Sequence, residues 1–436
     1  MSEIERKVRD LVEEIVETQG MPPYASDPKS NKKGKMPGVR YSGPVWDTNE
    51  ITAAITALLT GKWLASGEKV RKFEKKFSEY IGARDSVMVN SGSSANLVMI
   101  AALKKRFGWK DGDEVIVSCV GFPTTINPLI QNGLKPVFVD ISWDDLNWSI
   151  DDIQKKITDR TVAVFSSPVL GNPYDLERLS KICKDNSIKM IGDNCDTLGT
   201  LWKGKHFSSY FVASSCSFYP AHHISTGEGG MVSSDDPEII TTARSFAWWG
   251  RDCYCVGPAN MLSCGTCGNR FDKWLPEYEG TVDHKYIFVN QGYNLKPLDM
   301  QGAIGLEQIK KLPRIHKNRR YYKEKISSLV QKIPGTRVPD ELPSAETSWF
   351  GVPVICETSE LKESLVNFLE TRGIQTRNYF AGNILLHPGY RDLGDPLDYP
   401  NACKVLGNVF FLGCSPNYTE DTLKTIQKTI DEFLLR

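Results

Sequence analysis

The sequence predicts an α/β protein whose larger part holds a mostly parallel sheet with helices on both faces. Short apolar runs such as 114–118 and 189–193 are typical of buried strands. An apolar pattern at helical spacing over 176–183 lies directly before the second of them. Strands that alternate with helices favour a parallel sheet covered on both sides. Ligands of such sheets bind at the carboxyl ends of the strands, where this chain has polar residues.

The elements follow in chain order. Residues 3–18 repeat apolar positions at helical spacing and predict an amphipathic helix, and a polar stretch rich in Lys, Gly and Pro then predicts an arm to about residue 43. The expected strands are 87–89, 114–118, 136–140, 162–165, 189–193 and 352–355, and the later expected helices are 176–183, 361–369 and 422–435. The pattern changes near residue 321. We therefore expect an N-terminal helix and arm (1–45), a large domain (46–320) and a smaller C-terminal α/β domain (321–436).

Composition excludes several classes of protein. The 436 residues carry 53 basic and 53 acidic side chains, so no net field favours nucleic acid or an anionic membrane. No apolar run approaches the roughly 20 residues that span a bilayer, and residues 1–6 lack the layout of a signal peptide. We expect a cytoplasmic protein without a nucleic-acid or membrane partner.

The turn Ser91-Gly92-Ser93-Ser94-Ala95 joins an expected strand to an apolar helix. Small residues let backbone amides approach an anion, and the helix N-terminus adds a favourable dipole. Gly92, Ser93 and Ser94 are therefore candidates for binding a phosphate. Taken alone, the same residues are as well explained by an ordinary helix cap.

Two further residues suit an aromatic cofactor. Asp193 closes a buried strand, and a carboxylate there can pair with a pyridinium nitrogen. Phe122, in a Gly-Phe-Pro loop, can stack on a flat ring. Separately, each residue has a simpler explanation, a cap for Asp193 and core packing for Phe122.

The run Ser217-Phe218-Tyr219-Pro220-Ala221-His222-His223 continues into Gly227-Glu228-Gly229-Gly230. Taken in order, the small-residue turn, the loop aromatic, the strand-end Asp and this run resemble the sugar-nucleotide aminotransferases. The run Gly292-Tyr293-Asn294-Leu295 is also similar to that family. The resemblance implies the type I fold of aspartate aminotransferase and a pyridoxal-phosphate-type cofactor. It implies phosphate contacts for Ser93, Ser94 and Ser217, stacking for Phe122, and pairing of Asp193 with the ring nitrogen. Asn294 would reach the phosphate of a neighbouring subunit, so the resemblance implies a homodimer with shared active sites.

The chain departs from the family pattern at two positions. His222 stands where those enzymes have the lysine that holds the cofactor as a Schiff base, and Asp196 stands where they usually have Gln or His. Imidazole has no primary amine, but it can carry a proton near neutral pH. We expect proton transfer without covalent attachment of the cofactor. An inactive descendant is the simpler alternative, and His223 competes with His222 for the role.

Eleven cysteines in a chain without an export signal indicate thiols or metal ligands rather than disulfides. Cys253, Cys255, Cys264 and Cys267 fall within 15 residues. Zinc and iron–sulfur both accept four thiolates, so ligand count does not separate them. Together with Cys195 and His222, the layout resembles the CDP-4-keto-6-deoxyglucose 3-dehydrases, which bind pyridoxamine 5′-phosphate non-covalently and carry a 2Fe–2S cluster. The resemblance implies Cys195, Cys253, Cys255 and Cys264 as ligands, with Cys267 as the alternative to Cys264.

The resemblance also implies the reaction. Pyridoxamine phosphate condenses with the C4 ketone of a CDP-linked 4-keto-6-deoxyhexose, His222 removes a proton from the cofactor, and the C3 hydroxyl leaves. Electrons enter through the cluster from an NADH-dependent flavin/iron–sulfur reductase, and the product is a 3,6-dideoxysugar nucleotide, as used in lipopolysaccharide O-antigens. Tyr219 is a further candidate near the cofactor. Two alternatives stay open: a cluster-free dehydratase regenerated by glutamate, and a non-catalytic homologue that binds zinc.

Overall fold

The computed structural model describes residues 2–25, 38–253, 270–271, 275 and 277–436. Its centre is a seven-stranded sheet in the order β1-β9-β8-β5-β4-β2-β3. The strands are β1 (Asp85–Val89), β2 (Glu114–Ser118), β3 (Lys135–Val139), β4 (Thr161–Ser166), β5 (Lys189–Asp193), β8 (Ala213–Ser217) and β9 (Gly230–Ser234). In this sheet only β9 runs against its neighbours. The predicted α/β class with a mostly parallel sheet is confirmed, and the five predicted strands of the large domain all form.

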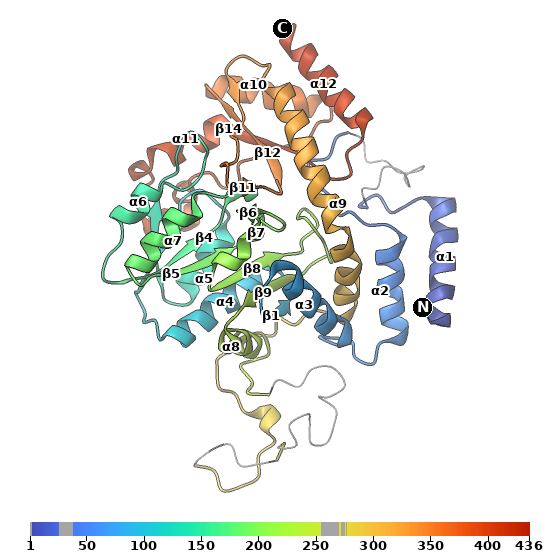
Figure 1. Ribbon diagram of the computed structural model, residues 1–436, viewed down its shortest axis with the longest axis vertical. Coiled ribbons are helices and arrows are strands. Elements are labelled where there is room, and N and C mark those ends of the chain that lie inside the picture. The colour runs from blue at the N-terminus through green and yellow to red at the C-terminus, as the bar shows by residue number, and fades with distance from the viewer. Residues whose placement is uncertain (1, 26–37, 254–269, 272–274, 276) are drawn as a thin grey trace.

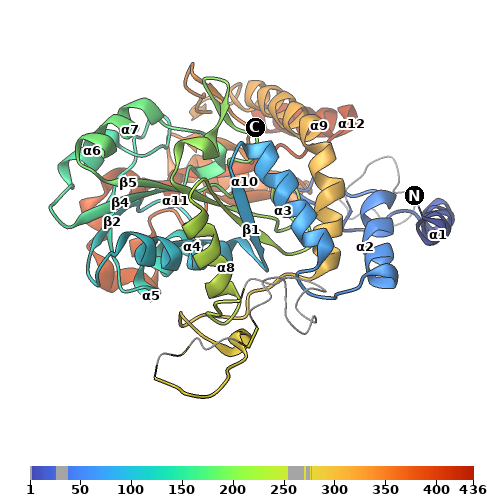
Figure 2. The same ribbon diagram turned by 60° about the horizontal axis from the view of Figure 1, so that its bottom comes forward.

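Helices cover both faces of this sheet (Figures 1 and 2). On one face α4 (Gly92–Phe107), α5 (Pro123–Gln131) and α8 (Pro237–Ala247) bury the apolar core that includes Val87, Val117 and Val232. On the other face lie α3 (Glu68–Ile81), α6 (Ile150–Lys155), α7 (Leu176–Asp185) and the first half of α9 (Asp299–Val330). Alternating strand side chains thus supply two separate cores.

The C-terminal part is built on a four-stranded antiparallel sheet in the order β10-β12-β14-β13. The elements are β10 (Thr336–Arg337), β12 (Gly351–Cys356), α10 (Ser359–Thr371), β13 (Thr376–Asn378), α11 (Pro400–Asn408), β14 (Val409–Gly413) and α12 (Glu420–Leu434). The second half of α9 packs on this sheet through Tyr322, Ile326 and Val330. The expected boundary at residue 320 therefore lies inside α9, and the division into domains stays a prediction.

The remaining elements are small or peripheral. Strands β6 (Leu201–Trp202), β7 (Lys205–His206) and β11 (Ala345–Glu346) form a three-stranded sheet. Helix α2 (Thr48–Thr60) packs on α9, and α1 (Glu3–Gln19) packs on α2 at the edge of the molecule (Figure 1). Short 3₁₀ turns are η1 (Val169–Gly171), η2 (Phe207–Tyr210), η4 (His284–Tyr286), η5 (Ile384–Leu386), η6 (Pro388–Leu393) and η7 (Pro396–Asp398). Among the described helices, none has the length and apolar character needed to cross a membrane.

Candidate active site

A small cradle forms where α4 begins and β8 ends. The Ser94 amide donates to Ser91 Oγ at 3.1 Å, which caps α4 and leaves the amides of Gly92 and Ser93 without intrahelical acceptors. A Cβ at Gly92 would lie 2.5 Å from Cβ of Ser217, so the helix and the strand end approach as closely as glycine allows. Free amides, serine hydroxyls and the positive end of a helix dipole suit a phosphate group.

Asp193 lies buried at the end of β5 with its carboxylate fixed from two helices. Its Oδ2 accepts a hydrogen bond from Asn96 Nδ2 of α4 at 2.8 Å and another from Thr125 Oγ1 of α5 at 2.6 Å. The Cys195 amide donates to Oδ1 at 3.4 Å, a long bond. Oδ1 is therefore able to accept a stronger bond from a protonated ring nitrogen, and the residues present fit a pyridine cofactor.

His222 lies between a carboxylate and an aromatic ring. Its side chain is 16% exposed, and Nδ1 is 3.4 Å from Asp196 Oδ1. The contact is electrostatic, since Nδ1 makes no directed hydrogen bond to the described residues. The ring of Phe350 packs on the imidazole, with centroids 5.3 Å apart, and the Tyr219 ring is 6.4 Å away. An imidazole so placed can gain a proton and be stabilised by Asp196.

His223 is part of the core instead. It is 1% exposed, and Nε2 donates to the carbonyl of Ser348 at 2.6 Å. Burial, then the charge of Arg319, lower the pKa of His223 well below its usual value, so the ring stays neutral. Of the two adjacent histidines, His222 has the ring that remains partly open to a ligand.

A model of the DegT/DnrJ/EryC1/StrS aminotransferase family matches residues 46–431. The chain belongs to this family. The fold of its solved members confirms the predicted type I architecture.

Several relatives of the chain have names that refer to deoxysugars or polysaccharides. A dTDP-4-dehydro-2,6-dideoxy-D-glucose 3-dehydratase of Saccharopolyspora spinosa is 36% identical over 408 residues, covering 91% of this chain and 87% of its own. The lipopolysaccharide biosynthesis protein RfbH of Salmonella typhimurium is 36% identical, with 90% and 91% covered. The structure is also similar to that of a GDP-4-keto-6-deoxymannose-3-dehydratase with a trapped PLP–glutamate geminal diamine. That similarity has a TM-score of 0.78 at 32% identity and covers 90% of this chain and all of that one.

The other residues expected to contact the cofactor are Phe122, Tyr219 and Asn294, and all three are more exposed than Asp193 and His222. Phe122 and Tyr219 are half-exposed, and Phe122 meets Phe380 edge-on at 5.9 Å. Asn294 is exposed, pairs with Trp248 and accepts a hydrogen bond from Lys296. Neither contact of Asn294 involves Gly92, Ser93, Ser94 or Ser217, which form the cradle. In the described residues, no contact therefore supports phosphate binding by Asn294 in its own chain.

Sequence reasoning missed three side chains that shape the site. Asn96 and Thr125 hold Asp193, and Phe350 covers His222. Asn96 had a signal, because a polar amide inside the apolar helix 92–107 has to find buried partners. Phe350 had none, since it comes from a segment far along the chain.

The cysteines are only partly described. Cys195 is half-buried beside Asp193, and Cys253 is buried. Burial and the Asp193 charge raise the pKa of the Cys195 thiol. Cys255, Cys264 and Cys267 lie outside the described residues. Within the described ranges no three His, Cys, Asp or Glu side chains gather as a metal site, so the expected cluster stays a prediction.

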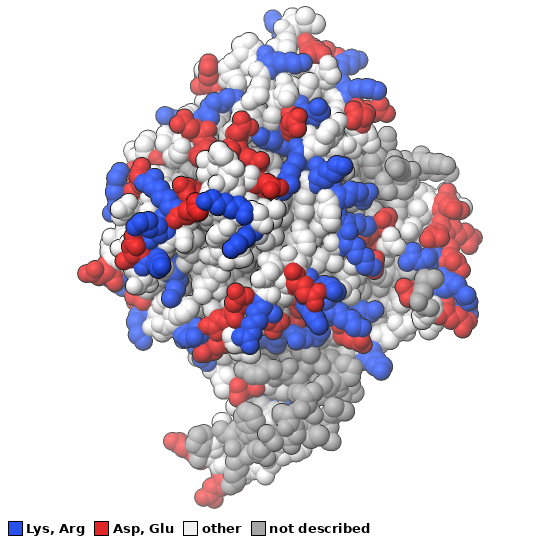
Figure 3. Space-filling view, viewed as in Figure 1, with Lys and Arg blue, Asp and Glu red and all other residues white. Residues whose placement is uncertain are grey.

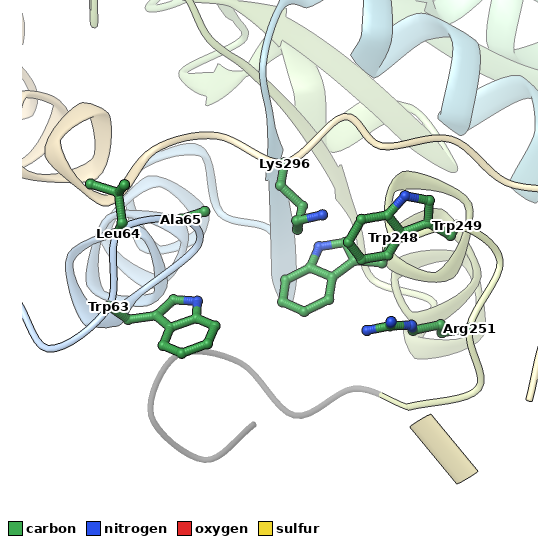
Figure 4. Close-up of a pocket in the computed structure, with 7 residues that line it drawn as sticks. All are labelled: Trp63, Leu64, Ala65, Trp248, Trp249, Arg251 and Lys296. Atoms are coloured by element: carbon green, nitrogen blue, oxygen red, sulfur yellow. The ribbon is translucent and has the colours of Figure 1, made fainter. Parts of the chain in front are cut away.

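A separate pocket of about 270 Å³ adjoins Asn294 (Figure 4). Its lining is aromatic, aliphatic and cationic, without an acid: Trp63, Leu64, Ala65, Trp248, Trp249, Arg251 and Lys296. The Arg251 guanidinium lies 4.6 Å from the Trp249 ring centroid, and the Lys296 ammonium lies 3.3 Å from it. Burial, helped by the nearby charge of Arg251, lowers the pKa of Lys296 to about 8. Two cations beside tryptophan rings suit an anion that carries an aromatic base.

Proposed function

We propose that this chain catalyses removal of the C3 hydroxyl from a nucleotide-linked 4-keto-6-deoxyhexose. Pyridoxamine 5′-phosphate would be bound without a covalent link, and a 2Fe–2S cluster would bring electrons from an NADH-dependent flavin/iron–sulfur reductase. Removal of a C3 group is supported by relatives named as 3-dehydratases. The choice of the CDP-linked sugar depends on the sequence resemblance in the cysteine layout.

The observation that carries the proposal is the setting of His222. A partly exposed imidazole stands 3.4 Å from a carboxylate in a family whose pattern places an amine there. Such a residue can move protons, but it cannot anchor a carbonyl. We therefore assign His222 as the base that takes a proton from C4′ of the cofactor.

The neighbouring residues would bind and orient the cofactor. Gly92, Ser93, Ser94 and Ser217 would hold its phosphate, and Phe122 would stack on its ring. Asp193 would hold the proton on the ring nitrogen, fixed by Asn96 and Thr125. Asp196 would stabilise protonated His222, and Tyr219 would hydrogen-bond nearby. When bound, pyridoxamine phosphate supplies a primary amine for the C4 ketone and a ring that accepts electrons.

We assign the nucleotide part of the substrate to the pocket of Figure 4, with Arg251 and Lys296 on the diphosphate. Asn294 adjoins this pocket, and its contacts are to Trp248 and Lys296 rather than to the cradle of its own chain. We therefore infer that Asn294 serves the cofactor site of a second subunit. Apolar side chains exposed near Asn294 support a homodimer: Leu64 (66%), Tyr286 (64%), Phe288 (54%) and Tyr293 (41%).

For the cluster, we assign Cys195, Cys253, Cys255 and Cys264 as ligands, with Cys267 as the alternative fourth. Cys195 follows Asp193 by two residues, which would bring a cluster close to the cofactor ring. A cluster there would supply single electrons, whereas zinc would have no evident role.

A second candidate is a cluster-free 3-dehydratase that glutamate regenerates. It is favoured by the similarity to the GDP-4-keto-6-deoxymannose-3-dehydratase structure with trapped PLP and glutamate. The two candidates share every assignment around His222 and differ in their source of reducing equivalents.

Iron and acid-labile sulfide analysis of anaerobically purified protein, followed by turnover with pyridoxamine phosphate and CDP-4-keto-6-deoxyglucose, separates the candidates. About two irons and two sulfides per chain, with turnover that needs a one-electron donor, is the expected result. Little iron and turnover supported by glutamate would establish the second candidate. One zinc per chain without binding of pyridoxamine phosphate would overturn both.

A further inference from the structure

Arg319 is a cation enclosed in protein directly behind the His222 loop. It lies on α9 and is 1% exposed. In the described part of the chain, no carboxylate is close enough to form an ion pair with it. Burial of an unpaired charge is costly, so a residue of this kind calls for an explanation.

The guanidinium of Arg319 donates hydrogen bonds to three backbone carbonyl groups. Nη1 donates to the carbonyls of Trp349 at 3.1 Å and Phe350 at 3.0 Å, and Nη2 donates to the carbonyl of His222 at 3.5 Å. Phe350 is also the residue whose ring packs on the imidazole of His222. One side chain thus holds the backbone of the base and of its aromatic cover.

The Arg319 Nε is buried too, without an acceptor in the described residues. Its charge also acts on this loop. The Arg319 charge contributes to the lowered pKa of neighbouring His223. Arg319 is therefore held at this loop by backbone carbonyls rather than by a carboxylate of the described residues.

We propose that Arg319 is a positioning residue for His222: it fixes the backbones of His222 and Phe350, and so holds the imidazole and the ring that covers it in place. A base has to lie within hydrogen-bonding reach of the proton that it takes, so the backbone that carries it has to be held in place. The inference depends on the proposed role of His222.

The matched variants are Arg319→Met, Arg319→Lys and the control Arg320→Met. Arg320 is the next residue of α9 and binds the carbonyls of Thr347 and Glu346, without a contact to His222 in the described residues. One readout is the rate at which diethyl pyrocarbonate modifies His222 in cofactor-free protein at a single pH, followed by peptide mass spectrometry, and the other is kcat and KM. His222→Asn identifies the peptide.

In Arg319→Met we expect diethyl pyrocarbonate to modify His222 several-fold faster, because the His222 loop and the covering Phe350 lose a shared hydrogen-bond donor. Arg320→Met should keep the wild-type rate of modification. Arg319→Lys should still lower kcat about 10-fold with little change in KM, because an ammonium group lacks the planar fork. Arg320→Met should keep wild-type kcat.

A wild-type rate of His222 modification in folded Arg319→Met, or a wild-type kcat in Arg319→Lys, would overturn the proposal. If Arg319→Met fails to fold, kcat of Arg319→Lys decides. Failure of the proposed function is recognised separately, because full turnover by His222→Asn would remove the base assignment, whereas the modification rates of the wild type and of Arg319→Met do not depend on turnover.

Discussion

At the scale of single residues, the central residues of the site could be predicted from the sequence, whereas the residues that hold them in place could not. Asp193 and His222 could be found from the sequence, since a strand end and a motif with one altered position identify them. Their supports could not be found, because Asn96, Thr125, Phe350 and Arg319 come from four segments that only the fold brings together. The choice between His222 and His223 also needed the fold, because it depends on which ring is buried.

Replacement of Asp193 by Asn tests the assignment to the ring nitrogen. The amide keeps the shape of the carboxylate but loses the charge that would hold a protonated ring. We expect kcat to fall at least about 100-fold with little change in thermal stability. Thr125→Val, which removes one of the two donors to Oδ2, should have a smaller effect. Turnover of Asp193→Asn within a few-fold of wild type would contradict the assignment.

At the scale of elements, the strands were predictable and the long helix was not. The runs 114–118 and 189–193 form β2 and β5 with the expected bounds, because continuous apolar runs are typical of strands covered on both faces. Helix α9 runs for 32 residues through Pro313, and its two halves pack on different sheets. The buried face changes along such a helix, so no single apolar stripe marks it in the sequence.

Gly92→Ala tests the contact between α4 and β8. A Cβ at this position would stand 2.5 Å from Cβ and 2.8 Å from Oγ of Ser217, so the helix start and the strand end have to separate. We expect the Kd for pyridoxamine phosphate, measured by fluorescence titration, to rise about 10-fold or more. The control is Gly121→Ala, where an added Cβ meets nothing within 4 Å. Equal affinities for the two variants would show that the cradle does not bind the phosphate.

At the scale of the whole molecule, charges of both signs are mixed on the surface, whereas two buried histidines, His206 and His316, are held in the neutral form. Basic and acidic side chains are interspersed over the face in Figure 3. Inside, burial lowers the pKa of His206 to about 4 and that of His316 to about 3. His316 bonds to Tyr80 and Ser348, each at 2.6 Å, one through each ring nitrogen. A neutral imidazole satisfies both contacts by donating once and accepting once.

These neutral histidines predict acid sensitivity. The pKa of His316 is about 3 in the folded protein against 6.5 for the free side chain, so between these values the unfolded chain binds the extra proton and stability falls as pH falls. From pH 7 to pH 5 the loss from His316 is about 2 kcal/mol of unfolding free energy. His316→Gln should lower stability at pH 7 but reduce its pH dependence by that amount, measured by denaturant unfolding at both pH values. An unchanged pH dependence would show that His316 does not contribute.

The most direct test of the central claim is hydrogen exchange at C4′ of pyridoxamine phosphate in D₂O with the nucleotide 4-keto-6-deoxyhexose present, followed by NMR. If His222 is the base, the wild-type protein exchanges one of the two C4′ hydrogens, and His222→Asn slows that exchange about 100-fold or more. Exchange at the wild-type rate in His222→Asn would contradict the account, because another group would then be moving the proton.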